Sequence, residues 1–156
     1  MNILVSACLL GIECKYNGGA NPHPLLMEAA GRGDVHLIPI CPECFGGLPI
    51  PRLPSEIRNG RVYAKDGRDV TDAFEMGARA ALHTARVYGC TAAILKERSP
   101  SCGSGLVYDG SFTGSLAPGD GVAARLLKEN GVAVYGESQA AQILAALTKQ
   151  TPPGQV

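Results

Sequence analysis

Four short apolar runs alternate with helical patterns, and this alternation constrains the fold more than any other feature of the chain. The runs, which predict β-strands, cover residues 2–7, 35–40, 91–96 and 132–135. The helical patterns cover residues 22–30, 70–88, 120–130 and 137–148. Strands and helices in alternation form βαβ units, whose right-handed crossovers put helices on both faces of a parallel sheet. The sequence therefore predicts an α/β fold: a three-layer, Rossmann-like, mostly parallel sheet of about four strands.

The helix expected at residues 70–88 is the clearest one, because small apolar residues recur in it at steps of three and four. Its apolar stripe consists of Phe74, Gly77, Ala81, Ala85 and Tyr88. Asp69 is placed to cap the N-terminus of this helix, and Gly89 is placed to end it. Small side chains permit a short distance between backbones, so we expect this helix to pack closely against the sheet.

Glycine and proline predict the turns and loops. Asp66-Gly67 predicts a hairpin turn between strands at 61–65 and 68–70. The stretch that follows Cys41 contains several prolines and Gly46-Gly47, so we expect a long loop of constrained shape.

The length and charge of the chain limit its organisation and its partners. A chain of 156 residues suits one domain, expected over residues 1–150, with a frayed tail at 151–156. The 14 basic and 14 acidic residues give no net charge, which argues against an extended nucleic-acid surface. No apolar run approaches about 18 residues, so no membrane span is expected. Residues 1–5 lack the basic start of a signal peptide, which predicts a cytoplasmic protein. The oligomeric state does not follow from the sequence.

Three of the six cysteines lie just after predicted strands. Cys8 and Cys41 follow the first two strands, and Cys102 lies a few residues past the third. Parallel strands end at one edge of a sheet, where such folds bind ligands, so we expect these thiols to converge on a metal. Thiolates favour zinc, copper(I) or an iron–sulfur cluster. Structural zinc usually takes two CxxC pairs, and Cys41–Cys44 is a single pair, but spacing alone does not separate zinc from a cluster.

Polar residues beside these cysteines are candidates for chemistry. Glu43 lies two residues from Cys41 and could act as a general acid or base, although a surface position is an equally good interpretation. Ser99 and Ser101 precede Cys102, where their hydroxyls could bind cluster sulfide or substrate, or cap a turn.

Basic residues and further thiols flank the same loops. Lys96 and Arg52 could balance cluster charge or bind an anionic group, whereas we expect Arg98 to be surface charge. Cys14 and Cys44 could each be a fourth ligand, a resolving thiol or a passive neighbour. The residues expected to be buried and inert, structural or exposed are Cys90, His23, His36 and His83.

Four strings of the sequence occur together in one known family. In order they are residues 6–11 (SACLLG), 41–43 (CPE), 46–52 (GGLPIPR) and 96–103 (KERSPSCG). With these strings the chain resembles the bacterial family called Domain of Unknown Function 523, which includes the 2-thiouracil desulfidase. The resemblance spans about residues 2–136.

The resemblance implies a cofactor and a reaction. It implies a [4Fe-4S] cluster held by Cys8, Cys41 and Cys102, with one iron left open to a substrate. It also implies an enzyme that removes sulfur from a thiolated pyrimidine without redox chemistry. The expected substrate is 2-thiouracil or a thiouridine-type compound, and the products are the oxo base and sulfide.

The resemblance also implies roles for single residues. Glu43 matches the family's proposed proton-transfer carboxylate, and a serine is implicated as well, either Ser99 or Ser101. Two positions depart from the family pattern. Asn17 stands where relatives often have aspartate, and Cys44 is unusual beside the Cys-Pro-Glu string. A fourth thiolate from Cys44 would close the open iron and prevent desulfuration.

Two functions of other classes stay open. One is a non-enzymatic metal-binding or redox-sensing thiol module, which Cys14 and Cys44 favour as extra thiols near the site. The other is a structural domain with reduced, buried cysteines. Sulfide release from a thiolated base separates both from the enzyme, and the natural substrate does not follow from the sequence.

Overall fold

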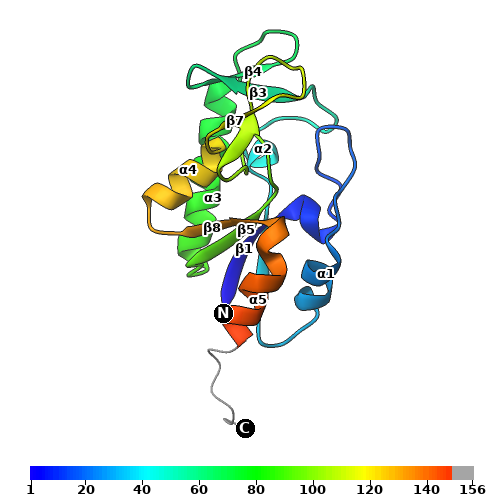
Figure 1. The fold of residues 1–156 in the computed structure, drawn as a ribbon, viewed down its shortest axis with the longest axis vertical. Coiled ribbons are helices and arrows are strands. Elements are labelled where there is room, and N and C mark those ends of the chain that lie inside the picture. The colour runs from blue at the N-terminus through cyan, green and yellow to red at the C-terminus, as the bar shows by residue number, and fades with distance from the viewer. Residues whose placement is uncertain (149–156) are drawn as a thin grey trace.

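The central sheet of the computed structural model, which describes residues 1–148, has four parallel strands in the order β2-β1-β5-β8 (Figure 1). These strands are β1 (Asn2–Ser6), β2 (His36–Ile40), β5 (Ala92–Leu95) and β8 (Ala133–Gly136). In the register, Leu4 of β1 lies between Ile38 of β2 and Ala93 of β5. The strands match the four apolar runs to within one or two residues at their ends. The predicted α/β class with a four-stranded parallel sheet is thereby confirmed.

Helices cover both faces of the sheet, as predicted. On one face lie α3 (Thr71–Val87) and α4 (Val122–Glu129), and on the other lie α1 (Pro24–Ala30) and α5 (Ala140–Thr148) (Figure 1). Alternate residues of a strand point to opposite faces. Leu4 accordingly packs with buried residues of α3 and α4, whereas Ile3 and Val5 pack with buried residues of α1 and α5. The helix predicted at 137–148 begins as a 3-10 turn, η2 (Glu137–Gln139), before α5.

The apolar stripe of α3 is largely as predicted. Its buried members include Phe74, Gly77, Ala81 and Ala85. Tyr88 was expected to join them but is 51% exposed, because the helix ends before it and the chain turns at Gly89 (φ 64°). The N-cap lies one residue later than predicted, at Val70. The Asp69 carboxylate nevertheless accepts a hydrogen bond from the Thr71 N–H group (3.0 Å) at the start of the helix.

The segment that follows Cys41 was expected to be a long loop, but its first part is helical. It begins with α2 (Pro42–Phe45), a single helical turn that packs on α3. Two glycines permit the close approach. A Cβ atom on Gly77 would lie 1.9 Å from the Pro42 carbonyl oxygen, and one on Gly46 would lie 2.0 Å from the Ala73 carbonyl oxygen. Only glycine leaves room for these backbones, so the sequence of α3 fixes where α2 sits.

An antiparallel hairpin follows α2, but its position differs from the prediction. Strands β3 (Ser55–Arg58) and β4 (Arg61–Ala64) pair through Asn59-Gly60, whose φ angles are 50° and 75°. Positive φ at both positions suits a two-residue hairpin turn, and Asn-Gly is the sequence that best provides it. The turn predicted around 66–67 is present, and residues 68–70 return along β4 with two backbone hydrogen bonds and one isolated antiparallel bridge, but they do not form a regular strand.

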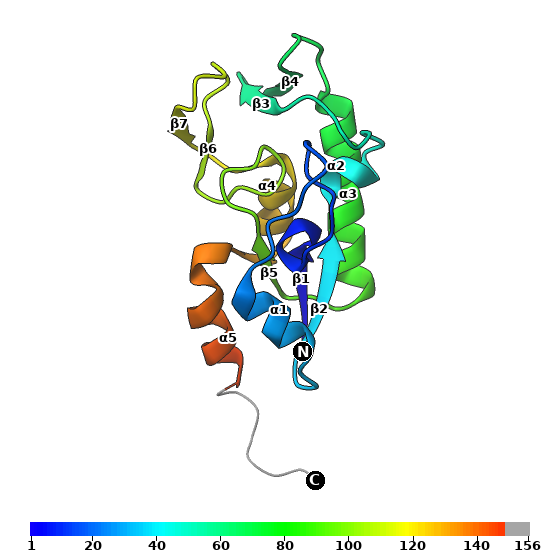
Figure 2. The same cartoon turned by 90° about the vertical axis from the view of Figure 1, so that its right-hand side faces the viewer.

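A second hairpin was not predicted at all. It consists of β6 (Leu106–Tyr108) and β7 (Leu116–Pro118) and pairs antiparallel. Figure 2 shows both hairpins beyond the carboxyl ends of the sheet strands, on the side away from the N-terminus. They therefore lie over the edge where the predicted site residues gather.

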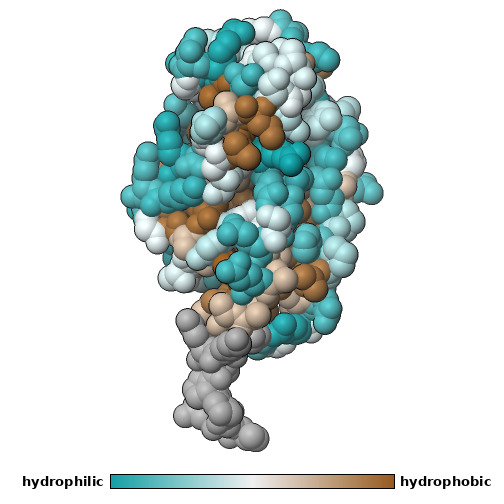
Figure 3. Space-filling model, in the orientation of Figure 1, coloured by the Kyte–Doolittle hydropathy of each residue, from teal (hydrophilic) through white to brown (hydrophobic). Residues whose placement is uncertain are grey.

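The surface seen in Figure 3 is mostly hydrophilic, and its apolar residues form separate patches rather than one continuous area. None of the helices within residues 1–148 is long and apolar enough to cross a membrane. The frayed tail predicted at 151–156 lies outside the described residues.

Candidate functional site

A cavity of about 770 Å³ opens at the carboxyl ends of β1, β2 and β5. Its lining includes Cys8, Cys41 and Cys102, the three thiols that were predicted to converge. Cys8 lies in η1 (Ala7–Leu10), the 3-10 turn directly after β1, and Cys41 is the N-cap residue of α2. Cys102 lies in the loop after β5. The parallel sheet thus brings together three residues that are far apart in sequence.

Burial controls the protonation of these thiols. It raises the pKa of Cys102 to about 12 and also raises the pKa of Cys8 above its ordinary value. Hydroxyl hydrogen bonds from Ser6 and Ser101 oppose the shift at Cys102, and a hydrogen bond from Asn21 opposes it at Cys8. Both thiols therefore keep their protons at neutral pH in the metal-free protein. Binding a metal must displace those protons.

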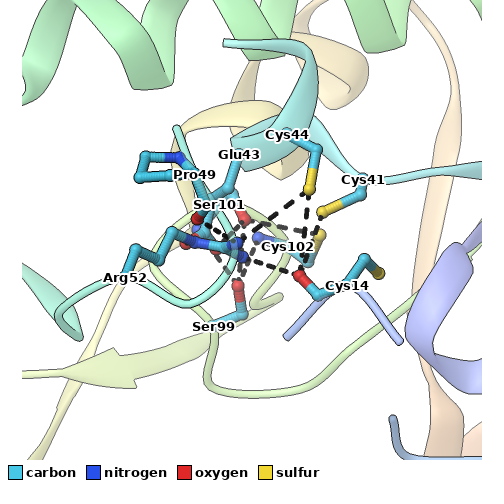
Figure 4. A network of polar contacts seen from close by, with 9 residues as sticks. All are labelled: Cys14, Cys41, Glu43, Cys44, Pro49, Arg52, Ser99, Ser101 and Cys102. Atoms are coloured by element: carbon cyan, nitrogen blue, oxygen red, sulfur yellow. Dashed lines mark hydrogen bonds and ion pairs between the residues drawn. The ribbon is translucent and has the colours of Figure 1, made fainter. Parts of the chain in front are cut away.

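Two further thiols lie beside Cys41. The Sγ atoms of Cys41 and Cys44 both lie near the carbonyl oxygen of Cys14, at 3.8 Å and 3.9 Å (Figure 4). Burial, then the neighbouring Cys41, raises the pKa of Cys14 to about 12. Cys14 lines the cavity, whereas Cys44 is not among its lining residues. Within residues 1–148, no three His, Cys, Asp or Glu side chains are arranged to hold a single metal ion.

Glu43, in the first turn of α2, forms an ion pair with Arg52. Its Oε1 atom lies 3.0 Å from Arg52 Nε, and the two side chains are 16% and 7% exposed. The Arg52 guanidinium also donates to the carbonyl oxygens of Cys14 (2.9 Å) and Pro49 (3.2 Å) and lies 3.9 Å from Cys44 Sγ (Figure 4). Arg52 thus joins the Cys14 loop, the proline-rich loop and α2 at one point. Burial opposes its charge, but the Glu43 carboxylate raises the pKa of Arg52 above its ordinary value.

The two serines before Cys102 have different contacts. Ser101 is 1% exposed, and its hydroxyl donates to Glu43 Oε2 (3.0 Å) and lies 3.6 Å from Cys102 Sγ. The Ser99 hydroxyl instead accepts hydrogen bonds from the backbone N–H groups of Ser101 (3.2 Å) and Cys102 (3.1 Å). Ser99 therefore shapes the turn, whereas Ser101 connects the carboxylate to a candidate ligand.

The comparisons with known proteins agree with this geometry. A family model described as 2-thiouracil desulfurase matches residues 3–139. The chain belongs to the 2-thiouracil desulfurase family. A relative described as uncharacterized protein YbbK, from Bacillus subtilis (strain 168), is 40% identical over 152 residues, which cover 91% of this chain and 99% of the relative. A solved structure of the [4Fe-4S]-dependent thiouracil desulfidase TudS matches with a TM-score of 0.88 at 40% identity, covering 95% of this chain and 98% of that one.

The structure agrees with some of the remaining predictions for residues near the site and differs from others. Lys96 lines the cavity and forms an ion pair with Glu137 (2.5 Å). Arg98 is exposed, as predicted, but it also lies in the cavity lining. Cys90 is buried in the α3–α4 core, as predicted. Among the described residues that line the cavity there is no histidine.

Sequence reasoning missed three polar residues of the site. Ser6 is 2% exposed and accepts a hydrogen bond from the Lys96 N–H group (2.8 Å). Its signal was a polar residue at the end of an apolar run. Glu137 directly follows a strand, which is the same signal that found the cysteines. Glu56, which also lines the cavity, carries no comparable sequence signal.

Proposed function

We propose that this chain is a [4Fe-4S]-dependent enzyme that replaces the sulfur of a thiolated pyrimidine with oxygen. The net reaction consumes one water, converts a C=S group to C=O and releases hydrogen sulfide, so no electron donor is needed. The observation that carries the proposal is the joint placement of Cys8, Cys41 and Cys102 around one cavity, with Glu43 bonded to Ser101 beside Cys102.

The residues present fit such a cofactor. Three thiols from three separate loops share the cavity, and thiolates are the ligands that iron–sulfur clusters take. The Ser6 hydroxyl accepts a hydrogen bond from the Lys96 N–H group and keeps its own proton to donate, and its hydrogen bond with Cys102 lowers the pKa of that thiol and so favours the thiolate. Cys8, Cys41 and Cys102 would hold the cluster, which would supply a Lewis acid suited to a soft sulfur atom.

The protein's own side chains then activate the attacking water and transfer its proton. The Glu43 carboxylate takes a proton from the water that attacks the thiocarbonyl carbon, because a carboxylate beside a reacting centre acts as a general base. Arg52 and Ser101 bond its two oxygens and fix its direction. The same carboxylate then gives this proton to the leaving sulfur, and the second water proton leaves the new hydroxyl group as the C=O bond forms and the C–S bond breaks. Hydrogen sulfide thus carries both protons of the water, which balances the reaction. Ser99 keeps the turn that carries Ser101 in shape.

A thiol module without enzymatic activity is the second candidate. The observation that favours it is the position of Cys14 and Cys44, whose atoms lie beside Cys41. Under this alternative, four thiolates would saturate the metal and leave no place for substrate. If the enzyme proposal holds, a Cys14→Ala/Cys44→Ala double variant keeps its iron and its sulfide release. Loss of iron in that variant would support the module instead.

Anaerobic reconstitution tests the proposed function. We expect the purified protein to take up iron and acid-labile sulfide in equal amounts and to release sulfide from 2-thiouracil or a thiolated nucleoside without a reductant. Cys8→Ala, Cys41→Ala and Cys102→Ala should each lose the iron and the activity. Cys90→Ala is the matched control, because Cys90 is buried in the core and does not line the cavity. A fully loaded wild-type protein that releases no sulfide from any thiolated base would refute the proposal.

A further inference from the structure

A loop far from the cysteine motifs supplies one wall of the cavity. Residues 109–115 connect β6 to β7, and Phe112 and Gly114 of this loop line the cavity together with Tyr108 at the end of β6. Tyr16, from the loop after η1, is a third aromatic residue in the lining. The cavity therefore combines thiols at the sheet edge with aromatic side chains from two other segments.

A buried carboxylate holds this loop in place. Glu56 of β3 is 8% exposed, and its Oε1 atom accepts hydrogen bonds from the backbone N–H groups of Gly110 (3.0 Å) and Phe112 (3.1 Å). These bonds join segments that are more than 50 residues apart in sequence. The loop is also packed tightly against β3 here, because a Cβ atom on Gly110 would lie 2.7 Å from the Ile57 carbonyl oxygen. These two hydrogen bonds attach the loop to β3.

The backbone of Phe112 has an unusual conformation. Its φ angle of 56° lies in the left-handed region, which bulky residues rarely adopt. The hydrogen bond from its N–H group to Glu56 holds it there. Such conformations are retained where the surrounding structure over-determines them, often at ligand sites. Here the outcome is a phenyl ring at the cavity lining, in a loop whose other residues are small or polar.

We infer that Phe112 is the surface against which the flat ring of the substrate packs, and that Glu56 is the residue that positions it. The inference rests on the proposed function, whose substrate is a planar pyrimidine. Aromatic side chains stack on such rings, and removal of one stacking partner weakens binding by about tenfold or more. Phe112 would thus determine affinity for the heterocycle, while the thiol and Glu43 side of the cavity performs the chemistry.

Substitutions of Phe112 in the reconstituted enzyme test the first part. We expect Phe112→Leu to raise the KM for 2-thiouracil about tenfold with kcat within about twofold, and to weaken binding of uracil, measured by titration calorimetry, by a similar factor. Phe112→Tyr keeps the ring and should bind as the wild type does. Tyr88→Leu is the matched control, because Tyr88 is an exposed aromatic residue outside the cavity lining.

Substitutions of Glu56 test the second part. Glu56→Ala should raise the KM and the Kd of uracil as Phe112→Leu does, and should increase hydrogen exchange of residues 109–115. Glu56→Gln keeps an oxygen that can accept both N–H bonds, so it should restore binding. Unchanged exchange and unchanged uracil binding in Glu56→Ala would show that Glu56 does not position Phe112.

The calorimetric measurement separates this inference from the proposed function. Should the wild type release no sulfide, the proposed function fails, and uracil binding still decides the role of Phe112. Equal uracil affinity in wild type and Phe112→Leu overturns the inference, and so does the absence of uracil binding in both. A loss of kcat at unchanged KM overturns it as well, because the ring would then act on the reaction rather than on binding.

Discussion

The Glu43 carboxylate is bound through both of its oxygen atoms, one by Arg52 and the other by Ser101. A carboxylate held in this way points in one direction before any substrate arrives. Its two partners come from loops 9 and 58 residues away in sequence. The direction of this carboxylate, which we propose as the general base, is therefore set by tertiary structure, although Glu43 itself is recognisable from its neighbour Cys41.

Glu43→Gln should abolish turnover and leave the cluster in place. The amide has nearly the same shape and can still contact Arg52 and Ser101, but it cannot take a proton, so we expect kcat to fall by about 100-fold or more. Iron content and the visible spectrum should match those of the wild type. Glu129→Gln, an exposed substitution on α4, is the control. Normal turnover in Glu43→Gln would remove this residue from the mechanism.

Substitutions of Arg52 should separate the effect of its positive charge from the effect of its hydrogen-bond geometry. Lysine keeps a positive charge but lacks the planar fork that reaches two carbonyl oxygens as well as Glu43. We expect Arg52→Lys to lower kcat about tenfold with little change in KM. Arg52→Ala leaves a partly buried carboxylate unpaired and should lower the free energy of unfolding by about 2–3 kcal/mol. Activity assays measure the change in kcat, and urea unfolding measures the change in stability. Equal kcat and equal unfolding free energy in Arg52→Lys and Arg52→Ala would contradict this prediction.

At the scale of elements, α2 is positioned by its contact with α3. Gly77→Ala would place a methyl group against the Pro42 carbonyl oxygen, where glycine leaves just enough room. We expect the free energy of unfolding to fall by about 1–3 kcal/mol, as for other overpacked contacts, together with a loss of activity because α2 carries Glu43. Gly33→Ala is the control, since a Cβ atom there meets nothing within 4 Å. Urea unfolding of the cluster-free Gly77→Ala and Gly33→Ala proteins measures the change in stability. Equal stability of the two variants would argue against the close contact.

The start of α3 is joined to β4 by Asp69, and this link should depend on pH. Arg61 and Thr71 lower the pKa of the Asp69 carboxyl below its ordinary value of 3.8. Because the folded-state pKa is the lower one, the stabilisation is present above about pH 4 and is lost as the pH falls further. Asp69→Asn should therefore melt below the wild type at neutral pH, and the difference should shrink at about pH 2.5. Thermal unfolding at the two pH values checks this, and a constant difference would contradict it.

For the molecule as a whole, the parts that could be predicted are those that depend on local pattern. The apolar runs identify the strands, and parallel pairing then places Cys8, Cys41 and Cys102 at one edge, because every strand points the same way. The prediction of a turn at Asp66-Gly67 did not include Asn59-Gly60, whose positive φ angles close the β3–β4 hairpin.

The parts that could not be predicted depend on contacts between distant segments. Arg52 was only one of several candidate cations, and nothing local indicates that its guanidinium reaches Glu43 and two backbone carbonyl groups. Glu56 has the appearance of an ordinary strand residue until the second hairpin is seen beside the first. That Ser101 rather than Ser99 bonds Glu43 likewise depends on the position of α2.

The neighbour of β1 on one side is β5, which the ribosome makes long after β1. Cys102 follows β5, so the third thiol leaves the exit tunnel when well over half of the polypeptide has been synthesised. A nascent chain that has not yet added β5 to the sheet offers two of the three thiols that we propose as ligands. The proposed set of thiols is consequently complete only after translation of β5 and its docking beside β1.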